Sequence, residues 1–531
     1  MESAYSLRTQ FEFNFLLTSA TRALVQPAIF AYVQAYVKRY FSGSNLKTFR
    51  PNKPATEMTE SWNTFASNTS LHGLRHVFGV SSWFRRIFWI LCMLAAILFY
   101  IYILSSNIRK YKSLPIDTRT SYEFNKNGIP FPAVTICNLN HFDKFKLDLG
   151  YEDKRFKTQG LDISACDIAH NISGNLTCGH ALLCATFEYA RSIMKNCTTE
   201  IRDALKEALE TSRSFDREEF VSRFGNEIES MLVGPCMFSF SENCSAKDFV
   251  PIISKAGLCH TFNNHMHEKN KHLHLAGAET GLRIILDTKG SWRTIGGRSV
   301  GFDVIIHNPS PVLPWSQGFH VQPGTNVKVL IQATKYIRLP KPYKSACSRK
   351  HLGDYGNYTR EHCILKCAND AITQDCGCRL LGSPVSKEVP VCSFKAEKCS
   401  HEVLEKWSQG SCSCQLPCEE ITYQSSTTYS KYPSETLLHV LKDRFNLNES
   451  ETYLKSNLVN LRIGFADNTH QVFTEYPSYD GESLFADLGG SMGLLLGCSI
   501  LTLVEFLDYL CMKIYAFLCS RNTRTAAEQN E

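Results

Sequence analysis

The sequence predicts an α+β membrane protein in which two transmembrane helices flank a large, disulfide-rich extracellular domain. Three observations support this fold class. Two long apolar runs, residues 87–108 and 488–504, carry no charge, and 18 of the 22 cysteines lie between them. The stretch between the runs alternates between strand-like and helix-like hydrophobic patterns. Because disulfides persist in oxidising compartments, so many cysteines place most of the chain outside the cytosol.

Composition limits what the chain can be. Of its 531 residues, 44% are hydrophobic and 20% are charged, so the chain can bury substantial cores and is not disordered. The net charge is only +6, and no dense stripe of lysine and arginine is present in the sequence. This charge distribution argues against a nucleic-acid-binding protein.

The two apolar runs differ in kind. Residues 87–108 are 22 uncharged positions between basic flanks, which is long enough to cross a bilayer as a helix. We assign the second transmembrane helix to residues 488–512, where an uncharged run with several glycines, residues 488–504, is followed by two acids, Glu505 and Asp508. Carboxylates inside a membrane helix are costly unless they face water or a partner, so this helix is the candidate functional segment.

Two spans leave both chain ends on one side of the membrane and residues 109–487 on the other. The cysteines and six Asn-x-Ser/Thr sequences indicate that residues 109–487 are extracellular. Residues 1–86 and 513–531 are then cytosolic, in a multi-pass protein of the plasma membrane. The expected glycosylation sites are Asn171, Asn175, Asn196, Asn243, Asn357 and Asn448.

The extracellular segment reads as a mixed α and β domain. Alternating apolar residues predict strands with one buried face at residues 131–138, 300–306, 327–333 and 459–465. Apolar residues at helical spacing, with acidic or serine residues at their starts, predict helices at residues 200–211, 216–231 and 434–445. The last strand ends within about twenty residues of the second apolar run, so domain and membrane helix are mechanically connected.

Ten cysteines crowd into residues 347–418. Zinc sites favour paired C-x-x-C ligands, whereas the spacings here are C-x-C and C-x-x-x-C in an extracellular segment, so we expect disulfides and no metal. Spacing alone does not select a pairing. Each bridge would stabilise a small helical subdomain by roughly 2 to 4 kcal/mol.

Two enzyme-like motifs fail on their context. Residues 489–493 match G-x-S-x-G, but the serine lies in an apolar run rather than between a strand and a helix. His267 and His272 resemble a zinc-protease pair, but the second histidine falls one position too late to share a helical face. The histidines of residues 260–274 could bind a metal or titrate, although a solvated loop is the commoner case. We expect neither enzyme activity nor a cofactor.

The second apolar run is the strongest candidate site. Gly489, Gly493 and Gly497 recur every four residues, a spacing that lets helices pack closely in a bilayer, and packing alone would explain them. The acids favour a further role. On a continuous helix Asp508 lies about 20° from Gly497 and Glu505 about 80° away, so one face would carry both glycine and acid. Around a symmetry axis, such a face would form a water-filled path for cations.

Three stretches of the sequence resemble the superfamily of degenerins, epithelial sodium channels and acid-sensing ion channels. Residues 71–73 (Leu-His-Gly) resemble its His-Gly gating motif, and residues 131–138 resemble the strand that enters its extracellular domain. Residues 488–509 closely resemble its pore helix. The match extends over most of the chain.

The resemblance implies a homo- or heterotrimer that conducts Na+, is blocked by amiloride and is gated or modulated through its extracellular domain. Each subunit would have antiparallel palm and β-ball strands and helical finger, thumb and knuckle regions. The selectivity filter would be Gly497, Cys498 and Ser499, a break in the second span with His72 and Gly73 folded beneath it. Gly493 matches a position associated with amiloride block, and Ala486 matches the small residue where bulk holds the gate open.

The resemblance also implies seven disulfides. They pair Cys137 with Cys259, Cys236 with Cys244, Cys347 with Cys418, Cys363 with Cys414, Cys367 with Cys412, Cys376 with Cys399, and Cys378 with Cys392. Four cysteines remain in the finger region, at positions 166, 178, 184 and 197, which suggests two bridges outside the family's common set.

Two other classes of protein share some of these features. An ATP-gated purinergic channel has two spans and a disulfide-rich loop, but it lacks the His-Gly and G-x-S motifs present here. A two-span ectoenzyme would need a phosphate-cradling glycine loop or paired catalytic carboxylates, and the sequence offers neither. The partners we expect are therefore Na+, amiloride-type blockers, like subunits and the lipid bilayer.

Overall fold

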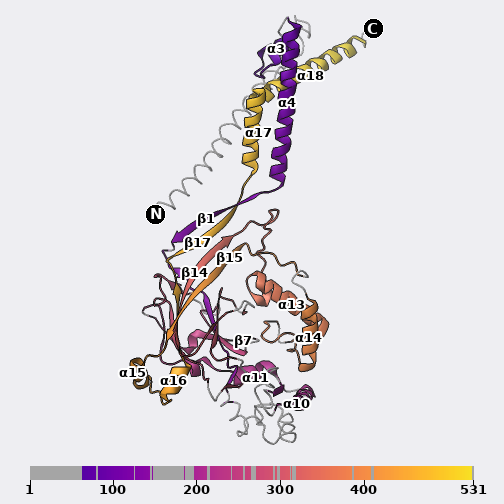
Figure 1. Cartoon of the computed structure of the whole chain (residues 1–531). Coiled ribbons are helices and arrows are strands. Elements are labelled where there is room, and N and C mark those ends of the chain that lie inside the picture. Colours follow the sequence, from indigo (N-terminus) through magenta and orange to yellow (C-terminus); the bar gives the residue numbers. More distant parts are fainter. Residues whose placement is uncertain are drawn as a thin grey trace, which may run out of the picture. The chain divides into compact units, whose positions relative to one another are not determined.

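The computed structural model describes most of the chain, and the chain divides into two compact units. One unit contains the residues up to 109 together with those from 482 onward, and the other contains residues 110–481. Figure 1 traces both units along the sequence. The described residues are 62–78, 82–124, 126–143, 146, 184–185, 197–211, 216–240, 242–254, 257–264, 271–290, 294–295, 299–310, 312–313, 318–385, 388–407 and 412–528.

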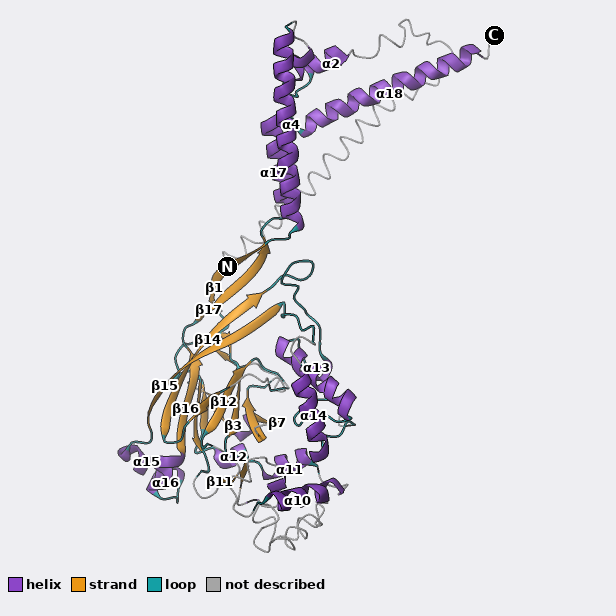
Figure 2. Ribbon diagram, turned by 45° about the vertical axis from the view of Figure 1, so that its right-hand side comes forward, coloured by secondary structure: helices purple, strands orange, loops and turns teal. Residues whose placement is uncertain are grey.

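Two sheets form the framework of the larger unit. The first has eight strands, in the order β1, β17, β14, β16, β10, β5, β6, with β15 also paired to β14. Their bounds are β1 Ile116–Phe124, β5 Cys236–Phe238, β6 Glu242–Cys244, β10 Leu282–Asp287, β14 Thr325–Ile337, β15 Glu419–Lys431, β16 Leu458–Phe465 and β17 Thr469–Pro477. Figure 2 shows β1, β14, β15 and β17 as the long strands of this sheet.

The second sheet has five strands in the order β13, β12, β3, β8, β7. They span β3 Ala133–Asn138, β7 Phe249–Ser254, β8 Gly257–Phe262, β12 Phe302–His307 and β13 Phe319–Val321. Among the described residues there are also two small strand pairs, β2 Ile129–Pro130 with β9 His272–Leu273 and β4 Phe142–Asp143 with β11 Thr294–Ile295. The four strands predicted from alternation are confirmed as β3, β12, β14 and β16, with ends shifted by a few residues.

The first sheet is mixed, which corrects the expectation of antiparallel strands only. Strand β14 pairs antiparallel with β15 but parallel with both β16 and β17. Parallel neighbours need a long crossover connection, and here about 120 residues of chain separate β14 from β16. The pattern of apolar residues reports which face of a strand is buried, not the direction of its neighbour, so periodicity could not reveal this arrangement.

The main core holds side chains of both sheets together with residues just outside them. Phe131 packs edge-on against Phe238 at 5.1 Å between ring centroids, and Phe238 also contacts Phe262. All three rings are almost fully buried, as are alternate residues of β14 such as Val327 and Val329. Each such side chain contributes roughly 1.5 to 3 kcal/mol by burial, so this core fixes the framework that carries the helices.

Helices flank the strands of this unit. Their bounds are α10 Thr199–Thr211, α11 Arg217–Phe224, α12 Ile228–Met231, α13 Arg360–Cys376, α14 Phe394–Lys406, α15 Glu435–Phe445 and α16 Glu451–Asn457. In Figures 1 and 2, α13 and α14 lie side by side on one flank, and α15 and α16 lie together near the start of β16. Ser434 caps α15 by accepting from the backbone N–H of Leu437, as the sequence predicts.

The predicted helix at residues 216–231 is wrong in its length, because the chain forms two helices there. Asp216 caps α11 as expected, but α11 ends at Phe224 and α12 starts only at Ile228. Gly225 lies so close to Leu258 of β8 that a Cβ at this position would press on the leucine side chain. This close approach to the sheet interrupts the helix, and it is a tertiary contact that helical periodicity does not encode.

The described part of the larger unit contains eight disulfides. Seven join the same cysteines that the family resemblance implies, from Cys137–Cys259 to Cys378–Cys392. The eighth joins Cys184 to Cys197, two of the four finger-region cysteines left over, whereas positions 166 and 178 lie outside the described residues. Five of these bridges hold the segment around α13 and α14, whose own core is small.

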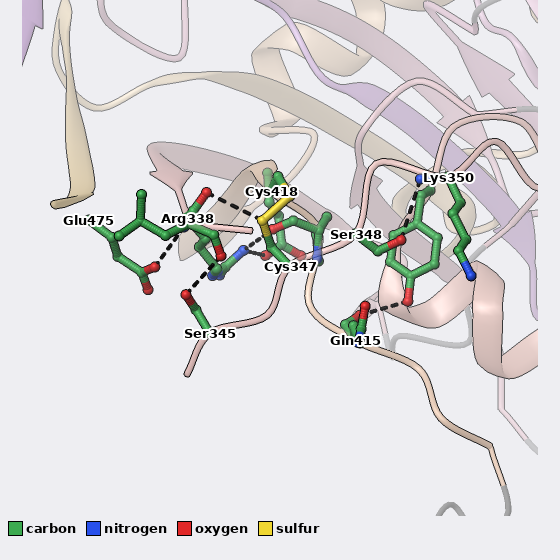
Figure 3. The surroundings of a disulfide bond; sticks show 12 residues. Arg338, Ser345, Cys347, Ser348, Lys350, Gln415, Cys418 and Glu475 are labelled. Atoms are coloured by element: carbon green, nitrogen blue, oxygen red, sulfur yellow. Dashed lines mark hydrogen bonds and ion pairs between the residues drawn. A yellow bond between two sulfur atoms is a disulfide. The ribbon is translucent and has the colours of Figure 1, made fainter. Parts of the chain in front are cut away.

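One disulfide connects the cysteine-rich segment to the long strands. Figure 3 shows Cys347 bonded to Cys418, with Arg338 beside them. The Arg338 guanidinium donates to Glu420 at 2.8 Å, and Glu475 of β17 accepts from the backbone N–H of Leu339 at 2.9 Å. The end of β14, the start of β15 and the end of β17 are therefore held together, and β17 leads directly to the second apolar segment.

The residues of the smaller unit that the structure describes form helices. They are α2 Trp62–Asn68, α3 Leu74–Phe78, α4 Trp83–Lys112, α17 Gly481–Leu496 and α18 Ile500–Glu528. Helix α4 contains the predicted span at residues 87–108 and is long and apolar enough to cross a membrane. Helices α17 and α18 pass the same test only as a pair, because the chain bends by 73° between them.

Candidate functional site

The bend between α17 and α18 occupies the three residues predicted as a filter. Helix α17 ends at Leu496, and Gly497 follows with a positive φ of 60°. The Gly497 N–H donates to the Gly493 carbonyl at 3.0 Å, which closes the helix with a left-handed cap. A residue with a Cβ adopts this conformation at a cost, so glycine is the residue that permits the bend here.

Ser499 starts the next helix. Its hydroxyl accepts from the backbone N–H of Thr502 at 3.3 Å, and the Thr502 hydroxyl accepts from the Ser499 N–H at 3.1 Å. This reciprocal pair is a capping box with threonine in the place of the usual acid. Gly497 ends one helix and Ser499 begins another, so the bend is specified locally by the sequence.

The helical-wheel argument, which treated the second apolar run as one continuous helix, is therefore wrong, whereas the break that the family resemblance implies at residues 497–499 is present. The angles between Gly497 and the acids assume 100° per residue without interruption, but the helix stops at Leu496 and restarts at Ile500 in another direction. Glu505 and Asp508 share only α18, where their spacing of three residues places them on neighbouring positions of one side.

The turn before the first apolar helix packs against this bend. The His72 N–H donates to the Leu496 carbonyl at 3.1 Å, and a Cβ added to Gly497 would overlap the His72 ring. Gly73 has a φ of 89°, and an added Cβ there would contact Met93 and Trp89 of α4. The structure thus brings His72, Gly73 and Gly497 together, as the family resemblance implies.

Hydroxyl groups and one acid extend this contact. Glu505 accepts from the Thr69 hydroxyl at 3.0 Å and from the Ser70 N–H at 3.2 Å. The Ser70 hydroxyl lies 2.5 Å from the Thr502 hydroxyl. The sequence reasoning missed Thr69, Ser70 and Thr502, because nothing in a local pattern marks a hydroxyl whose partner is more than 430 residues away.

Aromatic rings fasten α2 to α18. Phe65 stacks on Tyr509 with centroids 4.4 Å apart and meets Phe506 edge-on at 5.0 Å. Trp62 contacts Tyr509 as well as Phe78 of α3. Aromatic pairs contribute about 0.5 to 1.5 kcal/mol each beyond the burial of their area, so this cluster holds the segment before α4 against the first turns of α18.

The remaining predicted residues of this segment lie along α17 and α18. Gly493 is next to the bend, since a Cβ added there would lie 4.0 Å from the Cys498 carbonyl oxygen. The Cys498 side chain is buried, with 7% of its surface exposed, and carries a free thiol. Asp508 and Ala486 are exposed in this single chain.

A separate polar site lies in the larger unit. A cavity of about 830 Å³ is lined by the end of β12, the start of α13 and the start of β15. His307 Nε2 lies 2.8 Å from the Thr135 hydroxyl, and His307 Nδ1 lies 2.7 Å from the Asn308 carbonyl oxygen. His362 Nε2 lies 3.2 Å from the Ser310 hydroxyl. Burial lowers the pKa of His307 to about 4 and also lowers the pKa of His362.

Elsewhere in the larger unit, a buried ion pair ties α11 to the segment after α13. The Arg379 guanidinium makes two hydrogen bonds to the Glu218 carboxylate, at 2.6 and 2.7 Å, and only 6% of its side chain is exposed. These bonds are the main cause that raises the pKa of Arg379. Such a bidentate pair fixes orientation as well as contact.

The other sites expected from the sequence are placed as follows. Asn243, Asn357 and Asn448 are exposed, whereas the acceptors at positions 171, 175 and 196 lie outside the described residues. Among the histidines of residues 260–274, His260 is buried in β8, and positions 265 and 267 lie outside the described residues. Across the part of the chain that the structure describes, no three His, Cys, Asp or Glu side chains are placed to hold a metal ion.

Comparison with known proteins identifies the class of molecule. A family model described as "Amiloride-sensitive sodium channel" matches residues 65–509. The chain therefore belongs to the amiloride-sensitive sodium channel family, a family of ion channels, and the resemblance noted in the sequence is confirmed. The match begins within α2 and ends at Tyr509, so it includes both the turn at His72 and the bend at Gly497.

The individual relatives include channels named for sensing acid and one named for its sensitivity to bile acid. The chain is 28% identical to acid-sensing ion channel 1A of Danio rerio over 477 residues, which covers 86% of this chain and 88% of that protein. It is 28% identical to acid-sensing ion channel 1 of Gallus gallus, with 86% and 85% covered. It is 26% identical to the bile acid-sensitive ion channel of Rattus norvegicus over 503 residues, with 90% and 92% covered.

Proposed function

We propose that this chain is a subunit of a trimeric, amiloride-sensitive Na+ channel in the plasma membrane, gated or modulated through its extracellular domain. The observation that carries the proposal is the capped break at Gly497, Cys498 and Ser499 between two apolar helices. Where a helix is broken inside a membrane, backbone carbonyls no longer serve the helix ladder and can replace the hydration shell of an ion.

In this proposal the membrane segments have distinct roles. Gly497, Cys498 and Ser499 form the filter, and α4 together with the bent pair α17 and α18 spans the bilayer with both chain ends in the cytosol. Asp508, exposed on α18, attracts cations to the cytosolic side of the filter. Amiloride binds near Gly493, where no side chain fills the space next to the bend.

Gating in this proposal involves the residues around both ends of α17. The turn at His72 and Gly73 supports the filter from below, through the hydrogen bond of His72 to Leu496. Ala486 lies in the first half of α17, where a larger side chain would hold the pore open. Strand β17 ends at Pro477 and α17 begins at Gly481, so movement of the extracellular strands is transmitted directly to the pore helix.

Voltage-clamp recording tests the function. Cells that express the chain should carry an inward Na+ current that amiloride reduces, and replacing Ala486 by a bulky residue such as Phe should raise the standing current. A membrane that stays silent under acid, peptide and mechanical stimuli, with the protein present at the surface, would refute the proposal. An unchanged current for the Ala486 variant would refute only the gating role of that residue.

A further inference from the structure

The carboxylate of Glu505 ends a chain of hydrogen bonds that starts at the filter. The Ser499 N–H donates to the Thr502 hydroxyl at 3.1 Å, the Thr502 and Ser70 hydroxyls lie 2.5 Å apart, and the Ser70 hydroxyl lies 3.4 Å from Glu505. Thr69 adds a further donor to the same carboxylate oxygen at 3.0 Å. The path leaves α18 at Thr502, passes through the turn before α4, and returns to α18 at Glu505.

The charge of Glu505 sets the direction of this chain. An ionised carboxylate accepts hydrogen bonds and cannot donate, so the Ser70 hydroxyl donates towards Glu505. The Thr502 hydroxyl then donates to Ser70, and the lone pairs of Thr502 are left to receive the Ser499 N–H. Every donor points towards the carboxylate, and bonds aligned in this way strengthen one another where solvent is excluded. Thr502, at the centre of the chain, is fully buried.

The two acids of α18 therefore have different surroundings. Glu505 is half-buried, and one of its oxygens accepts from Thr69 and from both the backbone and the hydroxyl of Ser70. Asp508, one turn further along, is exposed. An acid that serves ions must offer free oxygens to the pore, whereas an acid that already accepts several hydrogen bonds is engaged by the protein.

We propose that Glu505 is a positioning residue, which fixes the turn at Thr69 and Ser70 and, through Thr502, the orientation of Ser499 in the filter. This inference rests on the proposed channel function and assigns a role within it. It separates Glu505 from Asp508, which the sequence alone treated as two equivalent pore acids. Loss of Glu505 acts on filter geometry and gating, whereas loss of Asp508 acts on the local concentration of cations.

Single-channel recording of a mutant cycle tests the proposal. We expect Glu505→Ala and Ser70→Ala each to change the Na+/K+ permeability ratio or the open probability at least threefold, and the double variant to show no more than either alone. Single-channel conductance should stay within twofold of wild type. Glu505→Gln, which keeps an acceptor oxygen, should restore most of the wild-type behaviour. The matched control Asp508→Asn should lower conductance and combine multiplicatively with Ser70→Ala.

The proposal is overturned if Glu505→Ala and Glu505→Gln lower conductance as Asp508→Asn does, or if the effects of Glu505→Ala and Ser70→Ala multiply. A cross-linking experiment gives a readout that needs no current. In cell membranes, Ser70→Cys with Thr502→Cys should form a disulfide under mild oxidation, identified by peptide mass spectrometry, and Glu505→Ala should reduce its yield. The exposed neighbour Ser67→Cys with Thr502→Cys is the control. Absence of the Ser70 cross-link overturns the inference, whereas absence of wild-type current overturns only the channel function.

Discussion

Gly497→Ala should disrupt the filter, because the new methyl group meets two obstacles. The residue has a φ of 60°, where a Cβ costs roughly 1 to 2 kcal/mol, and that Cβ would overlap the His72 ring. If the ring moves away, the hydrogen bond from the His72 N–H to the Leu496 carbonyl is lost, which costs about 1 kcal/mol more. The total of about 2 to 3 kcal/mol shifts the equilibrium away from the docked turn by roughly 30- to 150-fold.

Whole-cell current normalised to surface protein measures this effect. We expect Gly497→Ala to reduce the current at least tenfold or to lower its Na+/K+ permeability ratio by a similar factor. Gly489→Ala is the matched control, since no atom lies within 4 Å of a Cβ added there and alanine favours the helix. Wild-type current and selectivity in Gly497→Ala would refute the reasoning, because the bend would then not depend on a left-handed glycine beside His72.

Three further predictions concern the cap, a buried ion pair and a buried histidine. Ser499→Ala removes the cap of α18 at a cost of about 1 kcal/mol and should change the selectivity between Na+ and K+, whereas Ser499→Thr keeps the cap and should not. The Na+/K+ permeability ratio of each variant tests this. Arg379→Ala removes the ion-pair partner of the Glu218 carboxylate and should lower the free energy of unfolding by about 3 to 5 kcal/mol. Arg379→Lys should restore only part of this loss. Thermal unfolding of the purified protein measures both effects. His307 stays neutral when folded, with a pKa of about 4, but takes up a proton near pH 6.5 when unfolded. Stability should therefore fall by up to about 3 kcal/mol as pH drops from 6.5 towards 4, and His307→Gln should remove that part of the pH profile; an unchanged profile would contradict the assignment.

Much of the fold follows from local patterns. Alternation of apolar residues located β3, β12, β14 and β16, and the length of an uncharged run located α4. Side-chain caps such as Ser434 marked helix starts. These features are readable because a strand face, a helix stripe and a cap each depend on residues within a few positions of one another.

The errors arose where distant segments decide the structure. The parallel pairing of β14 depends on how a long crossover returns to the sheet, and the break between α11 and α12 depends on contact with β8. Neither leaves a periodic signal. The bend at residues 497–499 was a different case. The family resemblance implied a break there, whereas the helical-wheel argument treated the apolar run around Gly497 and Ser499 as one continuous helix.

The candidate site also contains residues that local motifs revealed and residues that only tertiary contacts reveal. His72, Gly73 and Gly497 were accessible through motifs, and the structure brings His72 into contact with Leu496 and Gly497. Thr69 and Ser70 were not, since short hydroxyl side chains in a polar turn are common and their partners lie on α18. Only the folded chain shows that one of the two acids is held by this turn.

The most direct test of the account is the reversal potential of the amiloride-sensitive current, measured as external Na+ is replaced by K+. If cations cross at the bend, the wild-type reversal potential should follow the Na+ gradient, and Cys498→Leu should shift it towards that of a poorly selective pore while surface expression is unchanged. A reversal potential that ignores Na+, or one that Cys498→Leu leaves unaltered, would contradict a cation path through residues 497–499.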